Sequence, residues 1–197
     1  MFTGIVRELG TVVSVERKPD VWRFCIAAPK TASGLTVGES VAVNGVCLSV
    51  VENRRGLLSV DAIAETRRRT TLGALTAGLR VNLEPSLSLS DRLNGHLVLG
   101  HVDGVGRVLR RDRRAGEWSL SIRVERALRA SLVPKGPITV DGVSLTVGAA
   151  MTPTTFRVFL IPETLQKTTL SVRQAGDRVN LETDYLAKLV AQLARSR

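Results

Sequence analysis

The chain has few of the residues that usually cross-link a protein or anchor it in a membrane. Its 197 residues include only two cysteines, Cys25 and Cys47, which are too few for a disulfide framework and favour a reducing compartment. No apolar run approaches the roughly 18 to 20 residues that a membrane-spanning helix needs. The first residues lack the basic segment and apolar core of a secretory signal. We therefore expect a cytoplasmic, globular protein with no membrane partner.

Common metal-binding and catalytic patterns are also missing. Histidine occurs only at His96 and His101, and no other histidine or cysteine stands at a spacing that completes a metal site. The chain has no P-loop, no dinucleotide-binding fingerprint and no Ser-His-Asp order. We expect no metal and no cofactor. Glycines accompany both histidines in residues 94–104, which favours the wall of a site over a purely structural role, because histidine carries protons near neutral pH.

Aromatic residues make up only 4% of the chain, although its formal net charge is +10. Such a charge raises the hypothesis of nucleic-acid binding, and arginines cluster at residues 67–69 and 110–114. Proteins that bind single-stranded nucleic acid interleave basic residues with aromatic ones, a pattern that is missing here. The second cluster is typical of a solvated hairpin tip. We expect no nucleic-acid partner.

The chain does contain an internal repeat. Residues 44–50 return as residues 141–147, and residues 80–84 return 98 positions later as residues 178–182. Smaller matches join residues 65–66 to 163–164 and, more loosely, residues 3–5 to 103–105. A duplication predicts two similar domains, each with a pocket for a similar ligand. It therefore indicates a protein that handles two copies of one small molecule.

Both halves consist mostly of short, β-branched runs between turns, which predicts strands. Asn44-Gly45 and Asp141-Gly142 predict tight hairpins, because both central residues of a type I′ turn need positive φ. A short helix capped by Thr66 or Thr164 is expected in each half. Five or six antiparallel strands in each half favour a small closed barrel. The expected strands are residues 5–15, 21–27, 40–43, 48–51, 57–62, 102–109, 118–124, 138–140, 144–147 and 156–160.

A polar, serine-rich stretch at residues 85–94 separates the halves, so the expected domains are residues 1–94 and 95–183. Residues 184–197 predict a helix with Thr183 or Asp184 as its N-cap. A helix of this length is marginal alone in water, so its apolar stripe needs a partner. The first half has no counterpart, which favours a contact between subunits over docking on its own barrel. The stripe consists of Tyr185, Leu186, Leu189, Val190 and Leu193.

The two predicted hairpins are candidates for ligand recognition. A strand that leaves a tight turn exposes backbone N–H and C=O groups, which can read the imide edge of a pterin or flavin ring. The alternative is that the hairpins serve folding alone. Cys47 in the first copy is replaced by Ser144 in the second. This asymmetry would let two similar pockets treat identical ligands differently, one as donor and one as acceptor.

Five segments together resemble the riboflavin synthases of the alpha-chain type, over essentially the whole chain. They are residues 1–6, 44–50, 95–104, 141–147 and 161–165. The resemblance implies an all-β fold of two tandem six-stranded Greek-key barrels with a C-terminal helix that helps to hold a homotrimer. It also implies dismutation of two 6,7-dimethyl-8-ribityllumazine molecules to riboflavin and 5-amino-6-(D-ribitylamino)uracil. The reactive pair is expected between barrels of neighbouring subunits.

The resemblance also implies site residues. The first-barrel pocket would use Gly4, Ile5, Val6, Cys47, Leu48, Ser49, Asp61, Ala62, Ile63, Ala64, Glu65, Thr66, Gly100, His101 and Val102. The second-barrel pocket would use Lys135, Ser144, Leu145, Thr146, Ile161, Pro162, Glu163, Thr164, Leu165 and Gln166. The catalytic candidates are His101, Cys47, Ser40, Thr3, Asp184, Ser144 and His96. Among them, His101 would shuttle protons, and Cys47 or Ser144 would position the attacking group.

Two residues depart from the family pattern. Ser49 replaces the usual threonine and keeps its hydroxyl, and Asn94 replaces a common glycine. The competing interpretation is a non-catalytic lumazine- or flavin-binding antenna protein, which shares the duplicated fold but loses reactive side chains. All the catalytic candidates are present here, which favours the enzyme. Association with a lumazine-forming enzyme is not indicated by the sequence.

Overall fold

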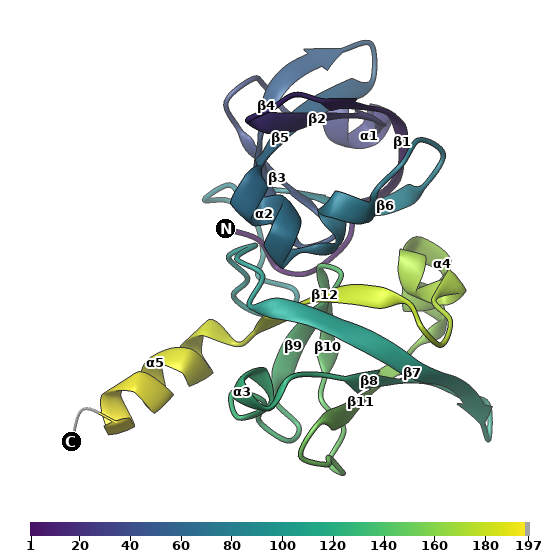
Figure 1. Ribbon diagram of the computed structural model, residues 1–197, viewed down its shortest axis with the longest axis vertical. Coiled ribbons are helices and arrows are strands. Elements are labelled where there is room, and N and C mark those ends of the chain that lie inside the picture. The colour runs from purple at the N-terminus through teal and green to yellow at the C-terminus, as the bar shows by residue number, and fades with distance from the viewer. Residues whose placement is uncertain (196–197) are drawn as a thin grey trace.

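Each half of the chain folds into six antiparallel strands, and the computed structural model describes residues 1–195 (Figure 1). In the first half the strands close a barrel in the order β1-β2-β5-β4-β3-β6. Its outward-facing positions alternate with a buried core of valine, leucine and isoleucine, in which Val41, Val60 and Leu83 are fully buried. The strands are β1 (Glu8–Arg17), β2 (Val21–Ala27), β3 (Ser40–Val43), β4 (Val46–Arg54), β5 (Leu57–Ile63) and β6 (Arg80–Pro85).

The second half repeats this arrangement around a core of its own. Its order is β10-β9-β12-β7-β8-β11, and the outer strands β10 and β11 meet at a single bridge between Val147 and Val158. The predicted pair of six-stranded Greek-key barrels is therefore confirmed. The strands are β7 (Gly104–Arg114), β8 (Glu117–Arg123), β9 (Pro137–Val140), β10 (Val143–Thr146), β11 (Thr155–Leu160) and β12 (Arg178–Thr183).

The two predicted hairpin turns are confirmed, and they also join the barrels. Asn44 and Gly45 have φ of 46° and 77°, and Asp141 and Gly142 have φ of 47° and 76°. The turns meet back to back, so that a Cβ on Gly45 would lie 2.7 Å from the Gly142 nitrogen. Only glycine permits this approach.

Two asparagines of equivalent strands hold the barrels together across these turns. Asn82 of β6 donates to the Asp141 carbonyl, and Asn180 of β12 donates to the Asn44 carbonyl, each at 2.8 Å. The two amides are almost fully buried. Because buried polar groups need partners, these reciprocal bonds specify how one barrel sits on the other.

Short helices follow β5 and β11, as predicted, but their capping differs. Thr66 and Thr164 lie inside the helices, whereas Thr70 and Thr168 accept hydrogen bonds from Leu72 and Leu170 N–H and cap the 3-10 turns that come next. The helices are α2 (Ala64–Arg69) and α4 (Pro162–Lys167), the 3-10 turns are Thr71–Ala74 and Thr169–Val172, and two single-turn helices, α1 (Pro29–Ala32) and α3 (Arg126–Arg129), complete the set.

The first segment of each half crosses to the barrel of the other half. Gly4 O accepts from Ser144 N–H at 2.7 Å, and Gly100 O accepts from Cys47 N–H at 2.9 Å. Both glycines have φ of 77°. The expected echo of residues 3–5 in residues 103–105 is therefore wrong, because the structural counterpart of Gly4 is Gly100. The crossing of the N-terminal segment also explains why the strand expected at residues 5–15 begins only at Glu8.

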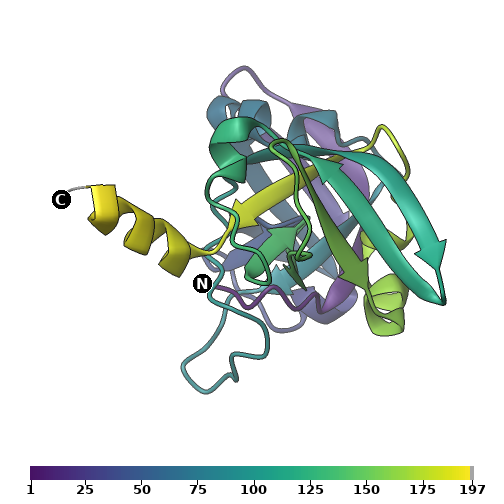
Figure 2. The same ribbon diagram turned by 90° about the horizontal axis from the view of Figure 1, so that it is seen from below.

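The predicted C-terminal helix is present as α5 (Tyr185–Arg195) and points away from both barrels (Figures 1 and 2). Asp184 caps it, since its carboxylate accepts from Leu186 N–H at 3.2 Å, whereas Thr183 ends β12. The expected helix also included residues 196–197, which lie outside the described residues. Its apolar stripe is uncovered: Leu186, Val190 and Leu193 are 57%, 66% and 71% exposed.

Candidate functional site

In both barrels the strands that carry the expected binding residues stop pairing at the same point. β4 and β5 pair from Arg54–Leu57 up to Val50–Val60, and β10 and β11 meet only at the equivalent pair Val147–Val158. Beyond these pairs the two strands separate, and at the gaps the Cys47 and Ser144 N–H groups donate to the crossing segments instead. The expected binding residues flank both gaps. At the first gap Cys47, Leu48 and Ser49 lie on one side and Asp61 to Thr66 on the other, and at the second gap Ser144, Leu145 and Thr146 lie on one side and Ile161 to Gln166 on the other.

The crossing segments lie along these freed strands. Val102 packs against the first core and Val6 against the second. Gly100, His101 and Val102 therefore lie at the first barrel, where they were expected. Gly4, Ile5 and Val6 were expected in the first-barrel pocket, but they lie at the second barrel, because the N-terminal segment crosses over and bonds to Ser144.

Four of the seven catalytic candidates gather at the second barrel. His96 Nδ1 and Ser144 Oγ are 2.8 Å apart, and His96 N–H donates to Thr3 O at 3.1 Å. Asp184 is close enough to act electrostatically on His96. Gly95 brings the segments together, since a Cβ there would lie 2.1 Å from Thr3 O. The cluster thus combines a hydroxyl, an imidazole and a carboxylate at the start of α5.

Burial favours the neutral form of His96. Desolvation lowers the pKa of His96 below its usual 6.5, and the negative charge of Asp184 opposes this without overcoming it. A neutral imidazole bonded to a hydroxyl through Nδ1 can accept the hydroxyl proton. Ser144 and His96 can therefore act as a proton-transfer pair near neutral pH.

The other three candidates lie at the first barrel. Cys47 opposes Ala42, and Ser40 opposes Ser49, two positions further along the same pair of strands. His101 follows Gly100 directly, is exposed, and occupies the place that Ile5 has in the second barrel. The two sites are thus built alike but carry different chemistry: Cys47 with His101 in one, and Ser144 with Ile5 and His96 in the other.

Two buried glutamates, which sequence reasoning missed, hold the crossing segments. Glu84 of β6 accepts from Thr3 N–H, Thr3 Oγ1 and Gly4 N–H at 2.7 to 3.0 Å. Glu182 of β12 accepts from Leu99 and Gly100 N–H at 2.8 and 2.9 Å. Burial raises the pKa of both carboxyl groups. The sequence feature that could have identified them is the repeated run that ends in glutamate, residues 80–84 and 178–182.

These bonds also limit what Thr3 can do. Its side chain is 1% exposed, and its hydroxyl donates to Glu84 while accepting from Ile5 N–H at 3.2 Å. Thr3 therefore positions the loop that carries Gly4, and its hydroxyl is already engaged.

Several expected binding residues have local ionic partners. Asp61 binds Arg23 through two bonds of 2.8 Å, which lower the pKa of the Asp61 carboxyl. Glu65 pairs with Arg68 and Arg69, and Glu163 pairs with Lys167. Lys135 is exposed, in a left-handed conformation, and its N–H donates to Val147 O at the closing bridge of the second barrel.

Within residues 1–195, no three His, Cys, Asp or Glu side chains are grouped so that they could hold a metal ion. No helix in that range has the length and apolar character to cross a membrane.

A fold of two such barrels with paired sites is that of the lumazine-binding proteins. The family described as "Lumazine binding domain" matches residues 3–86 and 99–184, one match in each half. Among solved structures, the complex of LumP with 6,7-dimethyl-8-(1'-D-ribityl) lumazine superimposes with a TM-score of 0.83 at 24% identity, over 93% of this chain and 99% of that one. The riboflavin complex of LumP gives 0.83 at 26% identity, over the same shares of the two chains.

Curated sequences narrow the class further. The riboflavin synthase of Mycobacterium tuberculosis (strain H37Rv) is 44% identical, over 100% of this chain and 99% of that protein. Those of Escherichia coli K12 and Bacillus subtilis are 41% and 38% identical, over 93% and 95% of this chain and 87% of each relative. The chain belongs to the riboflavin synthase family, whose members are enzymes of riboflavin biosynthesis.

Proposed function

We propose that the protein is a riboflavin synthase that converts two molecules of 6,7-dimethyl-8-ribityllumazine to riboflavin and 5-amino-6-(D-ribitylamino)uracil. One observation carries the proposal: both barrels stop pairing at the same point, and each gap receives a glycine-bearing segment from the other half. A duplicated site of this kind suits two copies of one flat heterocycle. The reaction transfers a four-carbon unit from one copy to the other.

The differences between the sites suit donor and acceptor roles. The reaction needs a base for the acidic 7-methyl group of one lumazine and a nucleophile that adds to the other. Ser144 and His96, 2.8 Å apart, can polarise an attacking hydroxyl or water at the second barrel. His101 at the first barrel is exposed and can exchange protons with solvent. Close orientation of the two rings supplies much of the acceleration.

The reactive pair needs more than one subunit. The gaps of one chain belong to different barrels, and we propose that the first barrel of one subunit faces the second barrel of a neighbour in a homotrimer. The uncovered apolar stripe of α5 supports this, because a helix of this kind is marginal without a partner. Asp184 links the stripe to the site, since it caps α5 and its charge acts on His96.

We propose a cytoplasmic location, supported by the two free cysteines. The roles assigned to the pocket residues are those carried over from the family, with Gly4, Ile5 and Val6 moved to the second barrel.

The test is to mix the purified protein with the lumazine and follow flavin absorbance and pyrimidine release. We expect one riboflavin for every two lumazines consumed. The solved LumP complexes make a non-catalytic binding protein the second candidate. It predicts saturable binding of lumazine without any flavin, an outcome that would refute the enzymatic proposal.

A further inference from the structure

Three arginines stand in a row across three neighbouring strands of the second barrel. Arg178 of β12 lies directly opposite Arg107 of β7, which lies directly opposite Arg123 of β8. Residues opposite one another share a face of the sheet, and like charges placed there repel. Among the described residues, none of the three has an ion pair or a side-chain hydrogen bond.

The first barrel has no such row. Arg80, the counterpart of Arg178, lies opposite Thr11, which lies opposite Ala27. The repulsion is therefore no requirement of the fold, and the second barrel carries it without a partner within the described chain.

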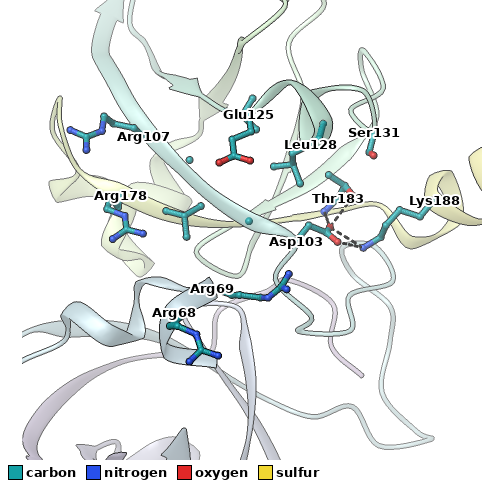
Figure 3. Close-up of a pocket in the computed structure, with 15 residues that line it drawn as sticks. Arg68, Arg69, Asp103, Arg107, Glu125, Leu128, Ser131, Arg178, Thr183 and Lys188 are labelled. Atoms are coloured by element: carbon teal, nitrogen blue, oxygen red, sulfur yellow. Dashed lines mark hydrogen bonds and ion pairs between the residues drawn. The ribbon is translucent and has the colours of Figure 1, made fainter. Parts of the chain in front are cut away.

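Two members of the row, Arg107 and Arg178, border a cavity of about 690 Å³ between the barrels (Figure 3). Arg107 and Arg178 line it from the second barrel, and Arg68 and Arg69 line it from α2 of the first. A volume of this size fits a small organic molecule. The residues expected to bind lumazine are missing from this lining, which adjoins them, since Asp103 follows Val102 and Arg68 shares α2 with Thr66.

The charges around the cavity are unequally satisfied. Asp103 is neutralised by Lys188, whose Nζ lies 2.8 and 2.9 Å from the two carboxylate oxygens. Arg68 and Arg69 share Glu65. Arg107 and Arg178 remain as unpaired cations, with the Glu125 carboxylate as the unpaired acid of the lining. Leu128 and Val105 add an apolar wall.

We propose that this cavity binds a phosphate ester that also carries hydroxyl or amino groups, as a nucleotide does. A phosphate between Arg107 and Arg178 accepts from both guanidinium groups and removes their repulsion. Glu125 accepts from the hydroxyl or amino groups, and the apolar wall receives a ring. The lumazine substrate of the proposed reaction has no phosphate, so the ligand is a different molecule. The inference goes beyond the proposed function and does not depend on it.

The test uses adenosine monophosphate as the probe, measured by calorimetry on the full chain at low salt, with adenosine as the uncharged control. We expect saturable binding of the monophosphate and at least tenfold weaker binding of adenosine. R107Q and R178Q should each weaken monophosphate binding at least tenfold. R80Q is the matched control, because it removes the equivalent charge of the first barrel, and it should bind as the parent does.

A second measurement keeps the proposal testable whatever the variants do to folding. Without ligand, R178Q should raise the thermal midpoint relative to the parent, because it removes a like-charge neighbour, whereas R80Q should not. The monophosphate should raise the midpoint of the parent and leave that of R178Q unchanged. Equal monophosphate affinity in R178Q and R80Q, or no binding by the parent at millimolar concentration, would overturn the proposal.

Discussion

At the residue scale, the two sites differ most at Cys47 and Ser144. Both residues donate their backbone N–H to a glycine carbonyl of a crossing segment, so the backbone treats them identically. Their side chains differ in chemical group and in partners: the Ser144 hydroxyl contacts His96, whereas the Cys47 thiol lies beside the segment that carries His101. The repeat predicted equivalent pockets, and the structure gives them different side chains at this position.

His101→Gln tests proton shuttling at the first barrel. We expect kcat to fall by about 10²-fold, the usual contribution of a general acid or base. Steady-state flavin formation measures it, and the thermal midpoint should stay at the parent value because His101 is exposed. Unchanged turnover would remove His101 from the mechanism.

His96→Gln tests the buried imidazole through the pH dependence of stability. Burial lowers the pKa of His96 below 6.5, so the folded protein binds the proton less well than the unfolded chain does. The parent therefore loses stability relative to H96Q as pH falls below about 6.5. Urea unfolding of both proteins between about pH 8 and pH 5, a range that brackets the usual histidine pKa, measures the difference in their free energies of unfolding. A difference that does not change with pH would contradict burial of the neutral form.

At the element scale, the crossing segments depend on β6 and β12. Glu84 and Glu182 are the penultimate residues of these strands, and inside the protein they satisfy the N–H groups of a turn that Gly4 or Gly100 makes possible. The same strands carry Asn82 and Asn180, which reach across to the opposite barrel. One strand in each half thus positions both the site segment and the neighbouring barrel.

Glu84→Ala should release the N-terminal segment from the second barrel. It removes one acceptor of three hydrogen bonds and leaves buried donors without a partner, which costs about 1 to 3 kcal/mol for each such group. We expect lower stability in urea and a raised KM, because Gly4 no longer stays beside Ser144. Glu182→Ala is the matched variant for the first barrel. A change in stability without any change in KM would show that these carboxylates do not position the binding sites.

At the scale of the whole molecule, α5 leaves the barrels with its apolar stripe uncovered (Figure 2). The helix is tied to its own subunit through Asp184 and through the ion pair of Lys188 with Asp103. Its direction is therefore determined by the second barrel, while its stripe is available to other copies of the chain.

Leu189→Asp together with Leu193→Asp tests the proposed assembly. Burying two carboxylates in an apolar contact is unfavourable, so the oligomer should dissociate toward the 21.3 kDa chain. Light scattering after gel filtration measures the mass, and flavin formation measured in parallel should fall with it. Lys188 stays in place, so the helix keeps its link to the barrel. A trimer that persists, or a fully active monomer, would contradict the proposed shared site.

The sequence by itself determined the features that arise from short-range physics. Positive φ at Asn44-Gly45 and Asp141-Gly142, period-two strands and an amphipathic C-terminal helix depend on residues close together in the chain. The internal repeat also predicted that the chain forms a pair of similar barrels. The sequence identified the segments of β6 and β12 as a repeat but did not predict them as strands. Their buried asparagine and glutamate interrupt the apolar alternation.

Only the tertiary structure decided which barrel each crossing segment serves. Gly4 meets Ser144 across 140 positions, whereas Gly100 meets Cys47 across 53. No local signal distinguishes these partners from those in the same half. The positions of Glu84 and Glu182 and the arginine row at Arg107 likewise follow from strand register, which is determined by the packing of both cores and not by neighbouring residues.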